Sequence, residues 1–598
     1  MIADRIAVVL AAVLVLLLWF DFEGDIAQRD AFSWMDPEQY YLFARDLHAN
    51  GMPEGGFAVP SIFPAVIAPF LSGDAAPSRA LRVNGAFLVL IALATWWLVR
   101  SAGRTHAGER TSRIWAALAV PLVLTTPLLA GLSRELYIEY ALTALVAWHL
   151  WVWTRTSFRR FDGWWLLFAL FTAIGLLTKM TYPLFLAGGL VVETALAIRG
   201  RNGGRWFRVA LAVAIPIGAV LLAIRIFLPE SFTYYISFGN TRIPIMRLIG
   251  PPDLLSLDSL LYYPRFFLTA GLGWLAPLAL ALGLLAIAIP SVRRSFWNRE
   301  RAILLATVIA PMVILAAQAV KEPRHIAPCL VPALVLVTIA ASRLTPARRA
   351  ISIGVALLLV SAGQYAEVRR SPAPYRLHEA LPIPEWERQM VAASPEAAAH
   401  TSPSGRLDAL TWRYTQSIAI EGFDPNEALA ITWYFRPAVV FNLDLDQWEG
   451  EDRTAYRRFE DLYYFPAFNT YNARCGWKKY YVSLSREEVL AHADFTLSRD
   501  DGGVRIEHNE TRRPASFREV YARRYLAEGA PGAARDLSAL YFAFFMEERL
   551  RGRIPEPGEL ERGFPGDFRY GERRNIYWMN VYGPLVRKTE DAIGSRAR

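Results

Sequence analysis

A pair of carboxylates lies just after the first apolar segment of the chain. Asp36 and Glu38 flank Pro37, and Gln39 follows. A carboxylate held close to a membrane surface can act as a general base toward a hydroxyl group. The same residues also suit a structural role, because Asp36 followed by Pro37 and Gln39 is an N-cap signature. Apolar residues then recur at helical spacing, so residues 36–47 are predicted to form a short helix along the membrane surface.

A second acidic site begins a later apolar segment. Glu135 and Glu139 are four residues apart, so both are expected on one face of a helix. A carboxylate one turn inside a membrane is costly and tends to have a partner or a function. The alternative to a catalytic role is an ion pair with Arg134 or Lys179 that locks the helices together.

Basic residues that could hold a phosphate lie at two breaks between apolar segments. Lys179 is in the first break, and Lys321, Arg324 and His325 are in the second. Arginine can bind phosphate bidentately, and lysine adds a point charge. Structural alternatives are that Lys179 extends to the membrane interface and that Glu322 pairs locally within its turn.

Long apolar segments must position these charged residues. Hydrophobic residues make up 54% of the 598-residue chain, and segments long enough to cross a hydrocarbon core recur up to residue 365. We predict about eleven membrane-spanning helices. Their expected ranges are 6–20, 81–99, 114–131, 136–153, 163–178, 182–198, 209–228, 266–289, 302–320, 326–342 and 350–365. No small-residue cleavage site follows residues 6–20, so we expect an uncleaved span there.

The distribution of arginine predicts the orientation of these spans. Short loops around residues 100–113, 155–160, 199–208, 293–301 and 343–349 carry most of the basic excess. Such loops face the cytoplasm, so the net charge of +9 reports membrane topology and not nucleic-acid binding. We therefore predict a multi-pass protein of the inner (plasma) membrane with a cytoplasmic N-terminus. The four charged clusters and the C-terminal domain are then extracytoplasmic (periplasmic), and the cations of residues 321–325 depart from the positive-inside pattern.

The composition changes after the last apolar segment. Residues 1–365 are expected to form the transmembrane domain, and residues 366–598 a soluble α/β domain. Strands are predicted at 439–443, 478–484 and 493–497, with a turn at 500–503 and a helix at 533–551. Cys329 and Cys475 are the only cysteines, which excludes a disulfide framework and a thiolate metal site.

The order and sidedness of these clusters resemble the GT-C superfamily of membrane glycosyltransferases. The resemblance covers about residues 1–365 and is nearest to bacterial protein O-mannosyltransferases and aminoarabinose-transferase type enzymes. It implies a GT-C-like helical fold and a polyprenyl-phosphate-sugar-dependent glycosyltransferase, which transfers a hexosyl or pentosyl group with inversion.

The resemblance also implies roles for individual residues. Asp36 matches the first-loop acid that deprotonates the acceptor hydroxyl, and Glu135 or Glu139 matches the second acidic position. Relatives often have adjacent acids in the first loop, whereas Pro37 separates Asp36 from Glu38, so the division of roles between these two stays open. The lipid-phosphate-binding residues implied are Lys179, Lys321, Arg324 and His325.

Other functions remain compatible with the sequence. A transporter or flippase of lipid-linked or anionic solutes would need charges near the bilayer centre and related halves, and neither is evident. A membrane scaffold would leave the four charged clusters without a common cause. The charged residues form no recognisable metal-ligand set, although a divalent metal stays open as a cofactor. The acceptor, whether protein, lipid or glycan, and the sugar are not specified.

Overall fold

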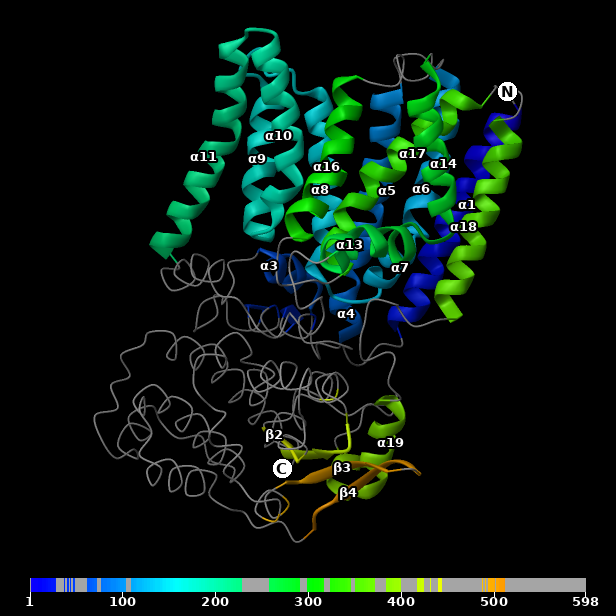
Figure 1. Cartoon of the computed structure of the whole chain (residues 1–598), viewed down its shortest axis with the longest axis vertical. Coiled ribbons are helices and arrows are strands. Elements are labelled where there is room, and N and C mark those ends of the chain that lie inside the picture. The colour runs from blue at the N-terminus through cyan, green and yellow to red at the C-terminus, as the bar shows by residue number, and fades with distance from the viewer. Residues whose placement is uncertain are drawn as a thin grey trace.

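The computed structural model covers the whole chain. The residues that it describes lie mainly in 2–27, 62–71, 77–103, 109–227, 257–290, 298–316, 323–345, 350–370 and 383–399, with parts of 417–510 and a few positions between 37 and 48. A helical bundle makes up most of this part, and a small sheet lies beyond one end of the bundle (Figure 1).

Each of the eleven predicted apolar segments is helical. They correspond to α1 (Ile2–Ala27), α5 (Val83–Gly103), α6 (Glu109–Leu124) with α7 (Pro127–Ser133), α8 (Ile138–Arg155), α9 (Gly163–Thr178), α10 (Tyr182–Arg199), α11 (Gly203–Phe227), α13 (Leu257–Phe266) with α14 (Ala276–Ala288), α16 (Arg299–Ala316), α17 (Leu330–Leu344) and α18 (Ala350–Arg370). Among the described residues, five helices are long and apolar enough to cross a membrane, or six if α6 and α7 form one span. The chain is an α-helical polytopic membrane protein.

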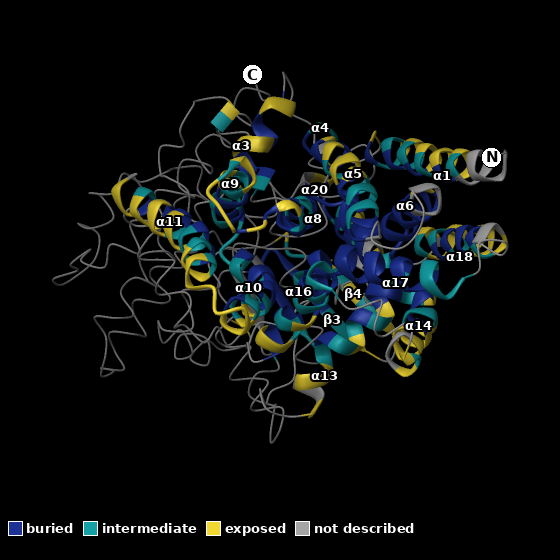
Figure 2. Cartoon of the chain, turned by 90° about the horizontal axis from the view of Figure 1, so that it is seen from above, coloured by how far each residue is buried: buried dark blue, intermediate teal, exposed yellow. Residues whose placement is uncertain are grey.

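The bundle buries small residues inside and leaves large apolar side chains on its outside. Helices α6 and α17 are mostly buried, whereas α11 exposes much of its length (Figure 2). Gly188 of α10 lies against α16 so closely that a Cβ atom there would overlap the backbone of Ala306. Small residues at helix contacts are typical of membrane proteins, where lipid covers the apolar exterior.

Two helices of the bundle are broken, and one glutamine satisfies backbone groups at both breaks. Helices α6 and α7 meet at 67°. A π-helical turn (Phe267–Leu272) separates α13 from α14 and ends at Gly273, whose φ is +56°. Gln364 accepts a hydrogen bond from the backbone N of Trp274 at 2.7 Å and donates to the carbonyl of Thr125 at 3.1 Å. Inside a membrane such unpaired backbone groups would be costly, so Gln364 stabilises both breaks.

Short helices precede α5 at the end of the bundle nearest the sheet. They are α3 (Phe63–Ile67) and α4 (Pro77–Leu81). Before them, the described positions Pro37, Tyr40, Tyr41, Ala44, Leu47 and His48 have helical backbone, as predicted for residues 36–47. Tyr41 and Ala44 are buried with Phe22 and Phe63 in a separate apolar cluster, so this stretch packs against the bundle.

The sheet has four strands in the order β2-β1-β3-β4. Strands β2 (Val439–Asn442), β1 (Ser417–Glu421) and β3 (Phe495–Asp500) are parallel, and β4 (Gly503–His508) pairs antiparallel with β3. The predicted strands at 439–443 and 493–497 and the turn at 500–503 are confirmed, whereas β1 and β4 were not predicted. Helices α19 (Ile383–Ala393) and α20 (Pro395–Ala399) accompany the sheet. The predictions at 478–484 and 533–551 lie outside the described residues.

Candidate active site

A buried carboxylate at the start of α8 collects three basic side chains. Glu139 is 1% exposed, and its Oε1 forms an ion pair with Lys179 Nζ. The same oxygen lies 3.6 Å from Arg324 Nε and 3.9 Å from His325 Nε2. The other carboxylate oxygen, Oε2, has no hydrogen-bond partner among the described residues. Four of the predicted site residues, from three separate parts of the chain, therefore lie together.

Glu135 and Glu139 reach the site from different local structures. Helix α8 begins at Ile138 after an extended Tyr137, so Glu135 lies in the preceding turn and not on the helix face that its spacing suggested. Asn84 of α5 fixes this turn by donating to the carbonyls of Ser133 at 2.9 Å and Glu135 at 2.7 Å. Glu135 is buried, at 1% exposed. Asn84 was not predicted, because the contact joins residues far apart in sequence.

Lys179 occupies the extended residue between α9 and α10. Its backbone N donates to the carbonyl of Gly175 at 2.9 Å, and its carbonyl accepts from the N of Tyr182 at 3.0 Å. Tyr182 packs its ring against Gly175 and pairs its hydroxyl with His149 Nδ1 in the bundle interior. The Lys179 side chain contacts Glu139 and is only 20% exposed, so it does not extend freely to the interface. A histidine within an apolar segment was the sequence signal for this contact.

Arg324 and His325 belong to a 3-10 helix, Pro323–Cys329, that leads into α17. The Arg324 guanidinium lies over the Tyr137 ring, 4.5 Å from its centroid, and is 7% exposed. His325 Nδ1 is 3.5 Å from the Tyr263 hydroxyl. The predicted site residues Asp36, Glu38 and Lys321, and Glu322 as a local partner, lie outside the described residues.

Arg134 belongs to a neighbouring cluster that joins the first and last spans of the bundle. It binds Asp21 at 2.8 Å and Asp25 at 2.5 Å, both on α1, and contacts the hydroxyl of Tyr365 on α18. Arg369 of α18 completes the cluster through the same two carboxylates. Of the two ion pairs considered from sequence, Glu139 forms the one with Lys179, while Arg134 serves α1 and α18.

The charge balance around Glu139 suits an anion. Lys179 and Arg324 are permanent cations that share this one carboxylate, which leaves net positive charge in a largely buried place. Phosphate oxygens are strong acceptors for such donors. A divalent metal does not fit at Glu139, because cations already surround its carboxylate. The described residues contain no group of three or more His, Cys, Asp or Glu side chains that could hold a metal ion.

An apolar cavity of about 390 Å³ adjoins these residues between α3, α5, α8 and α9. Its walls include Phe63, Phe87, Trp148 and Phe171. They also include Thr178, the residue before Lys179, and Ala141, two residues after Glu139. Charged and apolar binding surfaces are therefore adjacent along the same two helices.

Comparisons with known proteins give structural likenesses at low sequence identity. No family model and no curated protein matches this sequence. The chain is similar to the crystal structure of ArnT from Cupriavidus metallidurans bound to undecaprenyl phosphate, with 17% identity, a TM-score of 0.46, and 73% of this chain and 85% of that chain covered. It is also similar to the Archaeoglobus fulgidus oligosaccharyltransferase in complex with Zn and sulfate, with 12% identity, a TM-score of 0.43, and 98% and 86% covered. The oligosaccharyltransferase AglB of that organism, with an inhibitory peptide and a dolichol-phosphate, gives 10% identity, a TM-score of 0.42, and coverage of 92% and 84%.

Proposed function

We propose that this protein is a membrane glycosyltransferase that moves a sugar from a polyprenyl-phosphate-linked donor to an acceptor hydroxyl. The observation that carries the proposal is the convergence of Lys179, Arg324 and His325 on buried Glu139. The cations suit the phosphate of the donor, and the adjoining apolar cavity suits its hydrocarbon chain.

The proposed reaction is a single displacement at the anomeric carbon. The acceptor oxygen forms the new glycosidic bond while the bond from the anomeric carbon to the phosphate oxygen breaks, which inverts the configuration. The bonding electrons leave with the polyprenyl phosphate, where Lys179 and Arg324 stabilise the charge. A carboxylate takes the proton of the acceptor hydroxyl. We assign this role to Asp36, with Glu38 as the neighbouring acid.

Glu139 has a different role in this proposal. A carboxylate that already binds two cations is a poor base, because proton uptake would break those ion pairs. We assign Glu139 to orienting Lys179 and Arg324 toward the phosphate. Glu135, in the turn that Asn84 fixes, is the second acid near the acceptor side.

We place this site at the extracytoplasmic face of the inner (plasma) membrane, with the N-terminus in the cytoplasm. The C-terminal domain, residues 366–598, then shares the compartment of the acceptor. Its proposed role is to bind or orient that acceptor, whether protein, lipid or glycan.

The test is mass spectrometry of the lipid that co-purifies with the protein, followed by turnover in proteoliposomes with candidate polyprenyl-phosphate sugars. We expect a bound polyprenyl phosphate and a glycosylated acceptor of inverted configuration. Asp36→Asn should abolish transfer while keeping the melting temperature. Full transfer by that variant would refute the assignment of the base, and movement of the lipid-linked sugar without any glycosylated product would support a flippase.

A further inference from the structure

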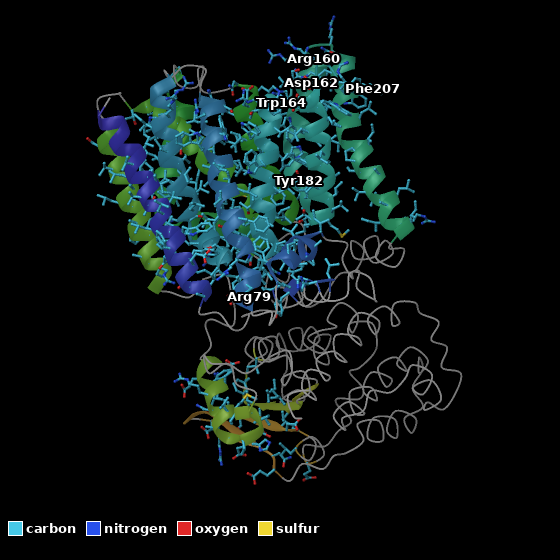
Figure 3. The ribbon with its side chains drawn as sticks, turned by 180° about the vertical axis from the view of Figure 1, so that it is seen from behind. Arg79, Arg160, Asp162, Trp164, Tyr182 and Phe207 are labelled. Atoms are coloured by element: carbon cyan, nitrogen blue, oxygen red, sulfur yellow. The ribbon has the colours of Figure 1, made fainter. Side chains whose placement is uncertain are left out.

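The end of the bundle opposite the Glu139 site carries an exposed surface of arginines and aromatic rings. Two turns form it, residues 156–162 between α8 and α9 and residues 200–202 between α10 and α11. The exposed arginines are Arg159, Arg160, Arg199 and Arg201, and the exposed aromatic residues are Phe161, Trp164, Trp206 and Phe207. Figure 3 shows Arg160, Asp162, Trp164 and Phe207 gathered at this end, far from Arg79. We call these eight exposed residues the arginine-aromatic surface.

The two turns are held together as one unit. Arg208 of α11 donates from Nε to the carbonyl of Phe158 at 2.8 Å, and its own carbonyl accepts from Trp165 Nε1 at 2.9 Å. The Arg208 guanidinium also lies 5.9 Å from the centroid of the Phe161 ring. Phe158 is buried against Phe168. The exposed arginines therefore project from a fixed platform.

Arg201 occupies a backbone position that favours glycine. Its φ is +49°, and it ends α10 with hydrogen bonds from its own N to Ile198 and from Asn202 N to Ala197. This is the left-handed C′ position of a Schellman motif, at which glycine is the usual residue. Here Gly200 lies one residue earlier and the arginine takes the strained position. The exposed charge of Arg201 is kept at some cost in backbone energy.

Little negative charge balances this surface within the described part of the chain. Asp162 lies 3.4 Å from Arg160, and its carboxylate also caps α9 by accepting from Trp165 N. Arg159, Arg199 and Arg201 have no carboxylate partner among the described residues. The positive charge is thus available to a ligand.

We propose that the arginine-aromatic surface binds the headgroups of anionic phospholipids. It lies where α9 and α11 begin, so its aromatic rings are at the level of the membrane interface, which tryptophan in particular favours. Guanidinium groups there can bind lipid phosphates bidentately. Exposed Phe161 and Phe207 favour a lipid over an acidic protein segment, because their rings would insert among acyl chains.

The test compares two variants that remove the same charge. Arg160→Gln with Arg201→Asn changes the surface, and asparagine tolerates the left-handed conformation. The control is Arg388→Gln with Arg505→Gln, because both arginines are about equally exposed, at 70% and 69%, and lie on α19 and β4. Native mass spectrometry in detergent would measure the affinity for phosphatidylglycerol and for phosphatidylcholine.

We expect the wild-type protein to prefer phosphatidylglycerol. The surface variant should lose about 30-fold in that affinity, about five-fold for each arginine, while the control variant keeps it. Arg201→Gly should lose about five-fold while its melting temperature stays equal or rises, because glycine relieves the backbone. Equal phosphatidylglycerol binding by the wild-type and surface variants would overturn the proposal. So would polyglutamate binding that is as tight as the lipid and lost in the same variant.

Discussion

Replacing Glu139 by glutamine should disrupt the cation cluster without changing the shape of the side chain. Lys179 and Arg324 would then share a neutral group while remaining largely buried. At 3.6 Å and an effective dielectric constant of about 20, the attraction between Glu139 and Arg324 is about 4 to 5 kcal/mol. The net effect is smaller than the sum of such attractions, because burial of the charges offsets part of each one.

We expect Glu139→Gln to lower the free energy of unfolding by about 3 kcal/mol, the lower end of what loss of one partner of a buried ion pair costs. Lys179→Met should cost less, because Arg324 still neutralises Glu139. In the double variant the two effects should not add, and the coupling energy should be about 2 kcal/mol.

The assay is denaturant unfolding of the purified protein in detergent for the wild type, the two single variants and the double variant. Glu300→Gln is the control, because Glu300 is 27% exposed and lies 3.9 Å from Arg299, so its loss should cost under about 1 kcal/mol. Additive effects of Glu139→Gln and Lys179→Met, or a Glu139→Gln protein as stable as the wild type, would show that Glu139 does not hold these cations.

Three further substitutions test the framework of the site. Arg134→Met should destabilise the protein by about 3 kcal/mol, because it leaves two carboxylates of α1 unpaired, whereas Arg369→Gln, at a position 40% exposed, should cost under about 1 kcal/mol. Equal effects would contradict this ranking in unfolding measurements. Asn84→Ala should cost about 2 to 4 kcal/mol by leaving two buried carbonyls without donors, and it should lower sugar transfer further than the loss of folded protein explains. Gly188→Ala should lower the melting temperature by forcing α10 from α16, while Gly218→Ala, with open space at its Cβ, should be neutral or stabilising; the opposite order would refute the close contact of the two helices.

Hydropathy alone predicted the helical segments, because each span must satisfy its own backbone hydrogen bonds in lipid. It could not predict the breaks. The π-helical turn before Gly273 depends on Gln364, which is far away in the sequence. The interior partners Tyr137 and Tyr263 were missed for the same reason, since an aromatic residue in an apolar segment has no local mark of its contacts.

The arginines used to predict topology also have a structural task that the sequence did not reveal. Arg205 and Arg299 bind Glu193, which is fully buried, at 2.6 Å and 2.7 Å, and Trp153 Nε1 donates to the same carboxylate at 3.2 Å. Charge type and loop position indicated a side of the membrane. Burial decides which of these charges pair, and burial is a property of the folded bundle.

The most direct test of the proposed donor site is whether Arg324 recognises the phosphate of a polyprenyl lipid. Binding of polyprenyl phosphate and of the uncharged polyprenol would be measured for the wild type and for Arg324→Gln, with Arg388→Gln as an exposed control. We predict that the wild type and the control bind the phosphate form at least about tenfold more tightly, and that Arg324→Gln loses most of this preference while its binding of polyprenol is unchanged. Equal binding of both lipids by the wild type, or an undiminished preference in Arg324→Gln, would contradict the account.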